Sequence, residues 1–302
     1  MTEFYTFAST YGNKVLYRGI KNGRAVLLKD EFKPRLYVTG KNKSAWKSLY
    51  GQTLEEMVFE DIRAARDFVK NYKDVAGFEI HGLDQYQYQY ISEKFPGTID
   101  YDTSQMTVWS IDIESATEDG FPNIETANEE ILLISIVDRT TRNKVVFGTR
   151  QAEVKDAQYH LCSNEQAMLK RFIEFWQANY PDVVTGWNTD TFDFPYLVNR
   201  IIRILDEDWA KKLSPFGLIQ EKMIESRGKE IQTYDIVGIN QLDYLQLYRK
   251  FTYSQQESYA LGNIAEIELG DTKIESPHES FKDFYTKDWN LFVEYNIKDA
   301  DL

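Results

Sequence analysis

Residues 107–122 read TVWSIDIESATEDGFP and carry two acids, Asp112 and Glu114, within an otherwise apolar run. In a β-strand, residues i and i+2 point to the same side, so the two carboxylates share one face. The other face then holds Trp109, Ile111 and Ile113. Neighbouring carboxylates repel each other unless a positive charge lies between them, and a divalent cation is the simplest candidate. The alternative for this stretch alone is an edge strand whose outer face is wetted by acids.

The bulk composition is that of a protein with sizeable cores and no membrane segment. The chain has 302 residues, 42% of them hydrophobic, which is enough for two domains. No apolar run approaches the roughly 18 residues that span a bilayer, and the N-terminus lacks a signal-peptide pattern. The single cysteine excludes an internal disulfide framework, and three histidines far apart in sequence argue against a zinc site. We therefore expect an intracellular protein.

The charge is unevenly distributed along the chain. A net charge of −13 argues at first against a nucleic-acid partner. Residues 1–54, however, contain 10 Lys or Arg and 3 Asp or Glu, whereas residues 106–302 contain 20 and 34. A basic segment ahead of an acidic half indicates separate tasks for the two parts. A merely solvated basic surface is the alternative.

The pattern of elements changes near residue 105. Residues 1–105 read as short strands and turns, with helical spacing over 60–72. The tract 84–90, DQYQYQY, alternates strictly and predicts a half-buried strand or a surface ribbon. From residue 106 onward, strands alternate with helices, which is typical of an α/β layer. The sequence predicts a small α+β domain over 1–105 and an α/β domain over 106–302.

Within the second domain, local signals place most elements. EILLISIVD (130–138) and KVVFGT (144–149) continue the opening strand as an antiparallel meander. Ser163 and Gln166 form a capping box ahead of an apolar helix. A short buried strand then ends in the glycine turn of PDVVTGWN, and a helix begins at about Pro195. The terminal helix is expected to start at Asp288.

Further acids recur where these elements begin or end. Asp193 lies at a strand-to-helix junction, where an N-cap role needs no metal. Asp299 follows Tyr295 by four residues, which places both side chains on one helical face. Taken singly, Tyr295 would be a half-buried anchor and Asp299 a solvated acid.

Taken together, these segments form an ordered pattern of D-x-E, N-x-x-x-F-D and Y-x-x-x-D. The three parts are Asp112 to Glu114, Asn188 to Asp193, and Tyr295 to Asp299. This order resembles the three-part exonuclease pattern of family B DNA polymerases. The segments DIESATEDGFP, TGWNTDTFDFPY, SPFG and EYNIKD are similar to the T-even-like bacteriophage members of that family.

The resemblance implies an RNase H-like 3′→5′ proofreading exonuclease domain, a mixed sheet flanked by helices, preceded by the family's N-terminal domain. It implies two Mg²⁺ or Mn²⁺ ions held by Asp112, Glu114, Asp193 and Asp299, with the Tyr295 hydroxyl orienting the attacking water. The implied substrate is a single-stranded DNA 3′ end, in the cytoplasm of a phage-infected bacterium. Bound metals would invert the local field and let DNA approach an acidic protein.

The resemblance also suggests contacts with the DNA itself. Phe121 lies where the family places an aromatic ring next to the 3′-terminal base, and such stacking tolerates any sequence. An ordinary hydrophobic anchor is the alternative for Phe121. Phe192 and Asn188 belong to the second motif, and Asn188 is expected either to hold a sugar or phosphate or to stabilise the Gly186 turn.

Two basic residues complete the expected substrate contacts. Lys273 matches a lysine that the family places near the scissile phosphate. Residues 225–235 resemble a hairpin that helps to separate primer from template, with Arg227 near its tip. A plain surface hairpin is the alternative for this segment.

The sequence departs from the family in one large respect, because no polymerase domain follows. The chain ends three residues after Asp299, which we expect to be the least firmly held ligand because helix ends fray. The expectation is an excised fragment or one half of a split polymerase. The alternative function is a nucleic-acid-binding or assembly module that needs a separate polymerase subunit.

Overall fold

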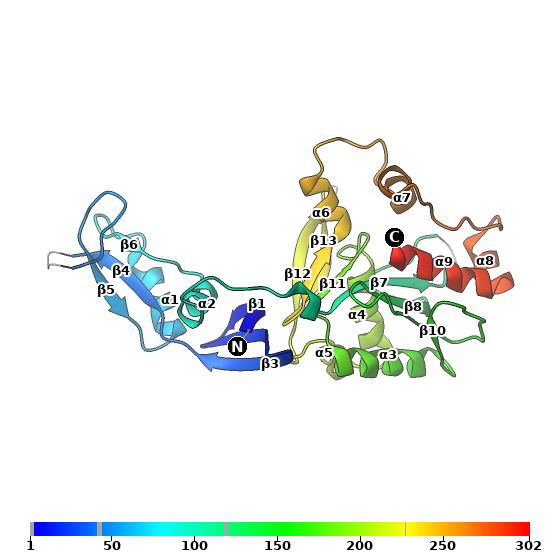
Figure 1. Cartoon of the computed structure of the whole chain (residues 1–302), viewed down its shortest axis with the longest axis horizontal. Helices are drawn as coiled ribbons and strands as arrows, with labels where there is room; N and C mark the ends of the chain where they lie inside the picture. Colours follow the sequence, from blue (N-terminus) through cyan, green and yellow to red (C-terminus); the bar gives the residue numbers. More distant parts are fainter. Residues whose placement is uncertain (1–2, 41–43, 118–119, 227) are drawn as a thin grey trace. The chain divides into compact units, whose positions relative to one another are not determined.

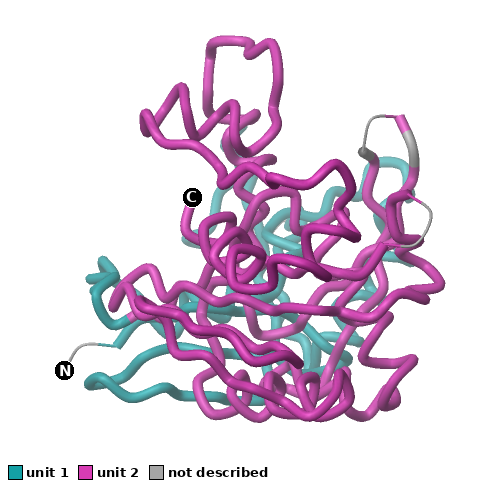
Figure 2. Tube along the Cα trace, turned by 90° about the vertical axis from the view of Figure 1, so that its right-hand side faces the viewer, with its two compact units in different colours: residues 1–105 teal, residues 106–302 magenta. Residues whose placement is uncertain are grey.

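A computed structural model describes four stretches of the chain, residues 3–40, 44–117, 120–226 and 228–302 (Figure 1). The backbone divides into two compact units, Met1–Gln105 and Met106–Leu302 (Figure 2). Each unit has a hydrophobic core of its own. Within these four stretches, no helix is both long enough and apolar enough to cross a bilayer.

The described residues of unit 1 form two antiparallel three-stranded sheets and two α-helices. The first sheet joins β1 (Glu3–Tyr11), β2 (Lys14–Lys21) and β3 (Arg24–Glu31). The second joins β5 (Leu54–Val58), β4 (Arg35–Thr39) and β6 (Ile80–His81). Helix α1 (Ile62–Tyr72) begins where the sequence predicts a helix, because the Asp61 carboxylate accepts a hydrogen bond from the Ala64 N–H. A short 3₁₀ turn (Thr103–Gln105) ends the unit.

The strand or ribbon predicted for residues 84–90 is wrong. Tyr86–Lys94 form helix α2, in which Tyr86 and Tyr90 are buried and Tyr88 is exposed. Tyrosines at every second position match the strand period of two, but Tyr86 and Tyr90 are also four residues apart, which is a helical spacing. The tract alone therefore fits both structures, and packing of the Tyr86 and Tyr90 rings into the unit 1 core selects the helix.

Unit 2 is built on a mixed six-stranded sheet in the order β10–β9–β8–β7–β11–β14. In chain order, its strands are β7 (Val108–Ser115), β8 (Ile131–Asp138), β9 (Lys144–Gly148), β10 (Gln158–Leu161), β11 (Val183–Gly186) and β14 (Asn240–Asp243). Strands β7, β8 and β9 form the predicted antiparallel meander. Strands β10, β11 and β14 each pair in parallel with a neighbour. The predicted fold class is confirmed.

Helices cover both faces of this sheet (Figure 1). Helices α3 (Glu165–Asn179) and α4 (Asp193–Ile204) pack on the face formed in β7 by Trp109, Ile111 and Ile113. Helix α9 (Trp289–Asp301) packs against β7 and β8 through a separate apolar cluster. Because side chains alternate along a strand, the even-numbered residues of β7 face α9.

The predicted capping box of α3 needs correction. The N-cap is Asn164, whose side chain accepts a hydrogen bond from the Ala167 N–H, and not Ser163. Both residue types are favoured N-caps and stand next to each other, so the sequence left an ambiguity of one residue.

Several further elements of unit 2 lie outside the six-stranded sheet. They are helix α5 (Glu207–Lys211), the hairpin of β12 (Ile219–Ser226) and β13 (Lys229–Ile236), and the helices α6 (Tyr244–Phe251), α7 (Leu261–Leu269) and α8 (Phe281–Lys287). Helices α6, α7 and α8 lead the chain from the end of β14 to α9.

Candidate metal centre

Strand β7 presents the first two acids of the site. Its odd-numbered apolar side chains are buried in the core, and Asp112 and Glu114 lie on the opposite face, as the sequence predicts. Strand β7 pairs with β11 only as far as Ser110. The two acids therefore lie on the part of β7 that is paired with β8 but has passed the end of β11.

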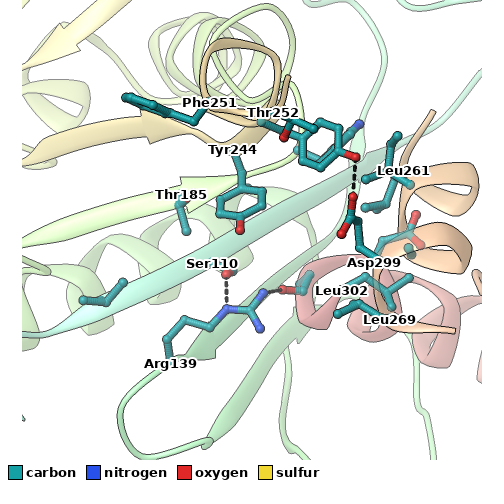
Figure 3. A pocket seen from close by; sticks show the side chains of 18 of the residues that line it. Ser110, Arg139, Thr185, Tyr244, Phe251, Thr252, Leu261, Leu269, Asp299 and Leu302 are labelled. Atoms are coloured by element: carbon teal, nitrogen blue, oxygen red, sulfur yellow. Dashed lines mark hydrogen bonds between the residues drawn. The ribbon is translucent and has the colours of Figure 1, made fainter. Parts of the chain in front are cut away.

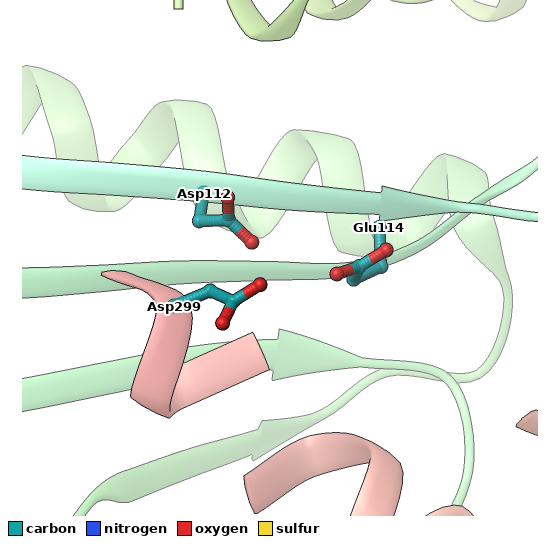
Figure 4. A group of neighbouring side chains, drawn as sticks. All are labelled: Asp112, Glu114 and Asp299. Carbon is teal, nitrogen blue, oxygen red and sulfur yellow. The ribbon is translucent and has the colours of Figure 1, made fainter. Parts of the chain in front are cut away.

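Helix α9 brings a third acid to this position. One carboxylate oxygen from each of Asp112, Glu114 and Asp299 lies within 4.8 Å of the others, and the three side chains point toward one another (Figure 4). Among the described residues, Asp299 Oδ1 has no hydrogen-bond partner although it is buried. Converging carboxylate oxygens are the donors that hard divalent cations prefer. The residues present therefore fit a Mg²⁺ or Mn²⁺ ion.

Asp193 is not one of the three converging carboxylates, although its charge acts on Asp112 and Glu114, and it has a structural contact of its own. Its Oδ1 accepts a hydrogen bond from the Ile113 N–H at 3.1 Å. Helix α4 begins at Asp193 itself and its N-cap, Phe192, makes no side-chain cap, so the alternative of an Asp193 N-cap is wrong. The Ile113 amide lies past the end of β11, and the Asp193 carboxylate takes the place of a strand partner there.

Burial and mutual repulsion make these carboxyl groups difficult to ionise. Burial first, and then the charges of Asp193 and Glu114, raise the pKa of Asp112 well above its usual range. Burial and the Asp299 charge raise the pKa of Glu114 to about 8. Burial raises the pKa of Asp193 to about 7, although the hydrogen bond from Ile113 opposes this. A divalent cation would reverse these shifts because it favours the ionised forms.

Lys273 supplies a positive charge to the site. Its ammonium pairs with Asp299 Oδ2 and lies 3.0 Å from the Tyr295 hydroxyl. Burial alone would lower the pKa of Lys273, but the Asp299 carboxylate and Tyr295 raise it further than burial lowers it. Tyr295 and Asp299 do share one helical face, as their spacing predicts, and Lys273 binds both. Its contact with a DNA phosphate stays a prediction.

Sequence reasoning missed Asn296 on α9, which is fully buried. Its Nδ2 donates to Asp112 Oδ2 at 2.6 Å, and its Oδ1 accepts a hydrogen bond from the Ser135 hydroxyl on β8. Asn296 thus fixes the orientation of the Asp112 carboxylate. The available signal was its position three residues before Asp299, which places both on the same helical face.

Arg139 joins the two elements that carry the acids. It follows β8 and donates hydrogen bonds to the Ser110 hydroxyl on β7 and, at 2.8 Å each, to the carbonyls of Ala300 and Asp301 on α9. Two further basic side chains form ion pairs with Asp301. Cations at the carboxyl end of a helix bind its free carbonyls and favour its dipole. The last turn of α9 is therefore tied to β7 two residues before Asp112.

A cavity of about 880 Å³ opens beside Asp299 (Figure 3). Helices α6 and α7 form two of its walls, with mainly aromatic and aliphatic side chains, and the end of α9 forms another. Ser110 and Arg139 lie at its floor, joined by the hydrogen bond drawn in the figure. Asp299 therefore borders an open space on this side and not solid core.

The loop before α4 is held through hydrogen bonds that its backbone N–H groups donate to Asp243. The Asp243 carboxylate accepts hydrogen bonds from the Asn188 N–H at 3.2 Å and from the Asp190 N–H at 3.1 Å. A Cβ on Gly186 would lie 2.5 Å from the Ile111 carbonyl, so only glycine permits this close approach to β7. Asn188, with a φ of +66°, belongs to this turn. A contact of its side chain with a sugar or phosphate stays a prediction.

Phe121 is presented to solvent and not anchored in the core. Its side chain is 77% exposed, and the centroids of the Phe121 and Phe192 rings are 4.9 Å apart. Phe192 in turn packs on Tyr196 of α4 and immediately precedes Asp193. The alternative of a buried hydrophobic anchor does not describe Phe121. The pair offers aromatic surface next to one of the site acids.

The hairpin predicted for residues 225–235 is present as β12 and β13. Arg227, expected near its tip, lies outside the described residues. Its contact with DNA therefore stays a prediction.

The whole arrangement can be compared with known proteins. The family model for the DNA polymerase family B exonuclease domain matches residues 79–264, more than half of the chain. The chain belongs to this family. The matched range includes β7 with Asp112 and Glu114 and the start of α4 with Asp193, and Asp299 lies beyond it.

Two phage members of the family align with the chain along its length. The DNA-directed DNA polymerase of Escherichia phage RB69 is 30% identical over 99% of the chain, and that of Enterobacteria phage T4 is 29% identical over 100%. A DNA polymerase of Thermococcus litoralis is 24% identical over 94% of the chain. The chain covers 36% of each phage polymerase, so it spans about a third of their length. The resemblance to phage family B polymerases is confirmed.

Proposed function

We propose that this chain is a metal-dependent 3′→5′ DNA exonuclease, the proofreading part of a phage-type family B DNA polymerase. The observation that carries the proposal is the convergence of the Asp112, Glu114 and Asp299 oxygens within 4.8 Å, in a chain of this family. The proposed substrate is the 3′ end of single-stranded DNA. The proposed partner is a polymerase domain or a separate polymerase subunit.

Asp112, Glu114 and Asp299 would hold Mg²⁺ or Mn²⁺, with Asp193 as the fourth carboxylate. Two such ions, when bound, lower the pKa of the attacking water and stabilise charge on the leaving oxygen of the phosphodiester. The buried Asp299 Oδ1 supports the assignment. A buried carboxylate oxygen without a partner costs stability unless a ligand satisfies it.

The other residues would position water and substrate. Burial and the Glu114 charge raise the pKa of Tyr295, so its hydroxyl stays neutral and can orient a water molecule by hydrogen bonding. Asn296 would keep the Asp112 carboxylate aimed at the centre. The exposed Phe121 ring, next to Phe192, would stack on the 3′-terminal base regardless of its identity.

The deciding experiment compares the wild type with the double variant Asp112→Ala/Glu114→Ala. A single-stranded oligonucleotide labelled at its 3′ end should release labelled mononucleotide in the presence of Mg²⁺ and not in EDTA. The double variant should be slower by roughly 10³-fold or more, because several kcal/mol of transition-state stabilisation are lost. Glu294→Ala, an exposed acid on α9, is the matched control and should keep full activity.

Two results would contradict this function. If the double variant digests DNA at the wild-type rate, the acids have been misassigned. If the wild type binds the oligonucleotide but leaves it intact with either metal, the chain is a nucleic-acid-binding or assembly module and not a nuclease on its own.

A further inference from the structure

Lys273 carries a permanent positive charge into the metal centre. It lies in residues 270–280, between α7 and α8, and its ammonium pairs with Asp299 Oδ2. When ionised, the four carboxylates proposed to hold the ions carry four negative charges, and the Lys273 ammonium offsets one of them. The ammonium therefore competes with a second divalent ion for the charge of Asp299 and repels that ion as long as Lys273 stays in place.

The two oxygens of Asp299 differ in what they contact. Oδ2 is held by Lys273, whereas Oδ1 is buried without a hydrogen-bond partner among the described residues. Asp299 can therefore offer one oxygen to a cation while the ammonium is present. It can offer both oxygens only after Lys273 has left.

The surroundings of Lys273 permit this movement. Its side chain is 31% exposed, and residues 270–280 form neither helix nor strand. The aliphatic part of the side chain lies against Gly262 of α7, where a Cβ would come within 3.3 Å of Lys273 Cγ. The missing Cβ at Gly262 lets the lysine stem lie directly against α7.

We propose that Lys273 is an exchangeable internal cation, which occupies Asp299 in place of a second divalent ion and must withdraw before that ion binds. This inference rests on the proposed function because it concerns the same centre. It predicts two sites that differ in affinity. One ion binds with Lys273 in place, and the second binds more weakly because the contact between Lys273 and Asp299 must first be broken.

The first test is a Mn²⁺ titration of the DNA-free protein by calorimetry. Lys273→Met removes the charge and keeps much of the side-chain length, and it should tighten the second Mn²⁺ site by at least tenfold. Lys298→Met is the matched control, because Lys298 pairs with Asp271 near the same segment, and it should change that affinity less than twofold. Lys273→Arg should keep the weak second site. An unchanged or weaker second site in Lys273→Met overturns the proposal.

The second test uses the wild type and does not depend on the folding of any variant. In the metal-free protein, the ammonium protons of Lys273 should be protected and visible by nitrogen-15 NMR. They should lose this protection as Mg²⁺ fills the second site. Protection that persists at saturating Mg²⁺, or a chain that binds no divalent ion, overturns the proposal.

Both tests are independent of cleavage. Ion binding that follows the predicted pattern without any nuclease activity refutes the proposed function alone. Nuclease activity with two sites that are insensitive to Lys273→Met refutes the exchange alone.

Discussion

Replacing Glu114 by glutamine should stabilise the metal-free protein at alkaline pH and leave it unchanged at acid pH. Glutamine has the shape of a protonated glutamic acid and no charge. Burial and the Asp299 charge raise the pKa of Glu114 from 4.5 to about 8, so the folded state binds this proton more tightly than the unfolded state does. The stability that Glu114 contributes is therefore complete below its unfolded pKa and is lost as the pH rises through about 8.

The magnitude follows from the difference between the two pKa values. A pKa difference of about 3.5 corresponds to about 5 kcal/mol, which is an upper limit. Glu114 is only partly buried and Lys273 lies within its field, so solvent and counter-charge reduce the penalty. We expect Glu114→Gln to raise the free energy of unfolding at pH 9 by about 1–3 kcal/mol, or Tm by roughly 2–12 °C for a unit of this size.

Scanning calorimetry in EDTA at pH 9 and pH 4 measures this effect. Glu294→Gln, on the exposed side of α9, should change Tm little at either pH. Added Mn²⁺ should reverse the order at pH 9, because the ion stabilises the protein that keeps its carboxylate ligand. Equal effects of Glu114→Gln at the two pH values, or a lower Tm at pH 9, would refute the reasoning.

Two further predictions concern the substrate and the frame of the site. Phe121→Ala should weaken binding of a single-stranded oligonucleotide by about 1–3 kcal/mol, measured by fluorescence anisotropy in Ca²⁺, and unchanged binding would exclude a stacking role. Arg139→Met should lower Tm by an amount equivalent to about 1–3 kcal/mol and weaken Mn²⁺ binding, because β7 and α9 lose their shared donor. Arg142→Met is its control, since Arg142 pairs with the Asp301 side chain. A lower Tm of Arg139→Met with unaltered Mn²⁺ affinity would show that Arg139 contributes to stability and not to metal binding.

Local periodicity predicts which of the acids share a face, whereas the full set of metal ligands was implied only by the resemblance to family B polymerases. The strand period places Asp112 and Glu114 on one face, and the helix period places Tyr295 and Asp299 together. The structure brings Asp112, Glu114 and Asp299 together. Each of these two patterns involves residues that are only two to four positions apart in the sequence.

The supports of the centre could not be predicted in this way, because they join residues far apart in the chain. Arg139 contacts the carbonyl of Ala300, and Ser135 contacts Asn296, each pair about 160 residues apart. Nothing near Arg139 in the sequence marks it as the residue that binds the end of a helix. The expectation of a weakly held Asp299 was based on the fraying of free helix ends, whereas α9 continues to Asp301 and Arg139 binds its last carbonyls.

The loop contacts were ambiguous for a different reason. A carboxylate at the start of a helix can cap that helix or reach a neighbouring strand, and the residue type does not distinguish these outcomes. Asp193 reaches the Ile113 amide because β11 stops before it, which is a property of the sheet and not of the local sequence.

The separation of the acids along the chain has a consequence for the time at which activity can arise during protein synthesis. Asp112 and Glu114 leave the ribosome about 190 residues before Asp299. At about 5–20 residues per second, this interval lasts roughly 10–40 s. Throughout it, the nascent chain has the strand acids without the helix acid and without Asn296, so the centre is incomplete. The proposed nuclease activity would therefore begin only after nearly all of unit 2 has been made, when β7 already has its partner strands.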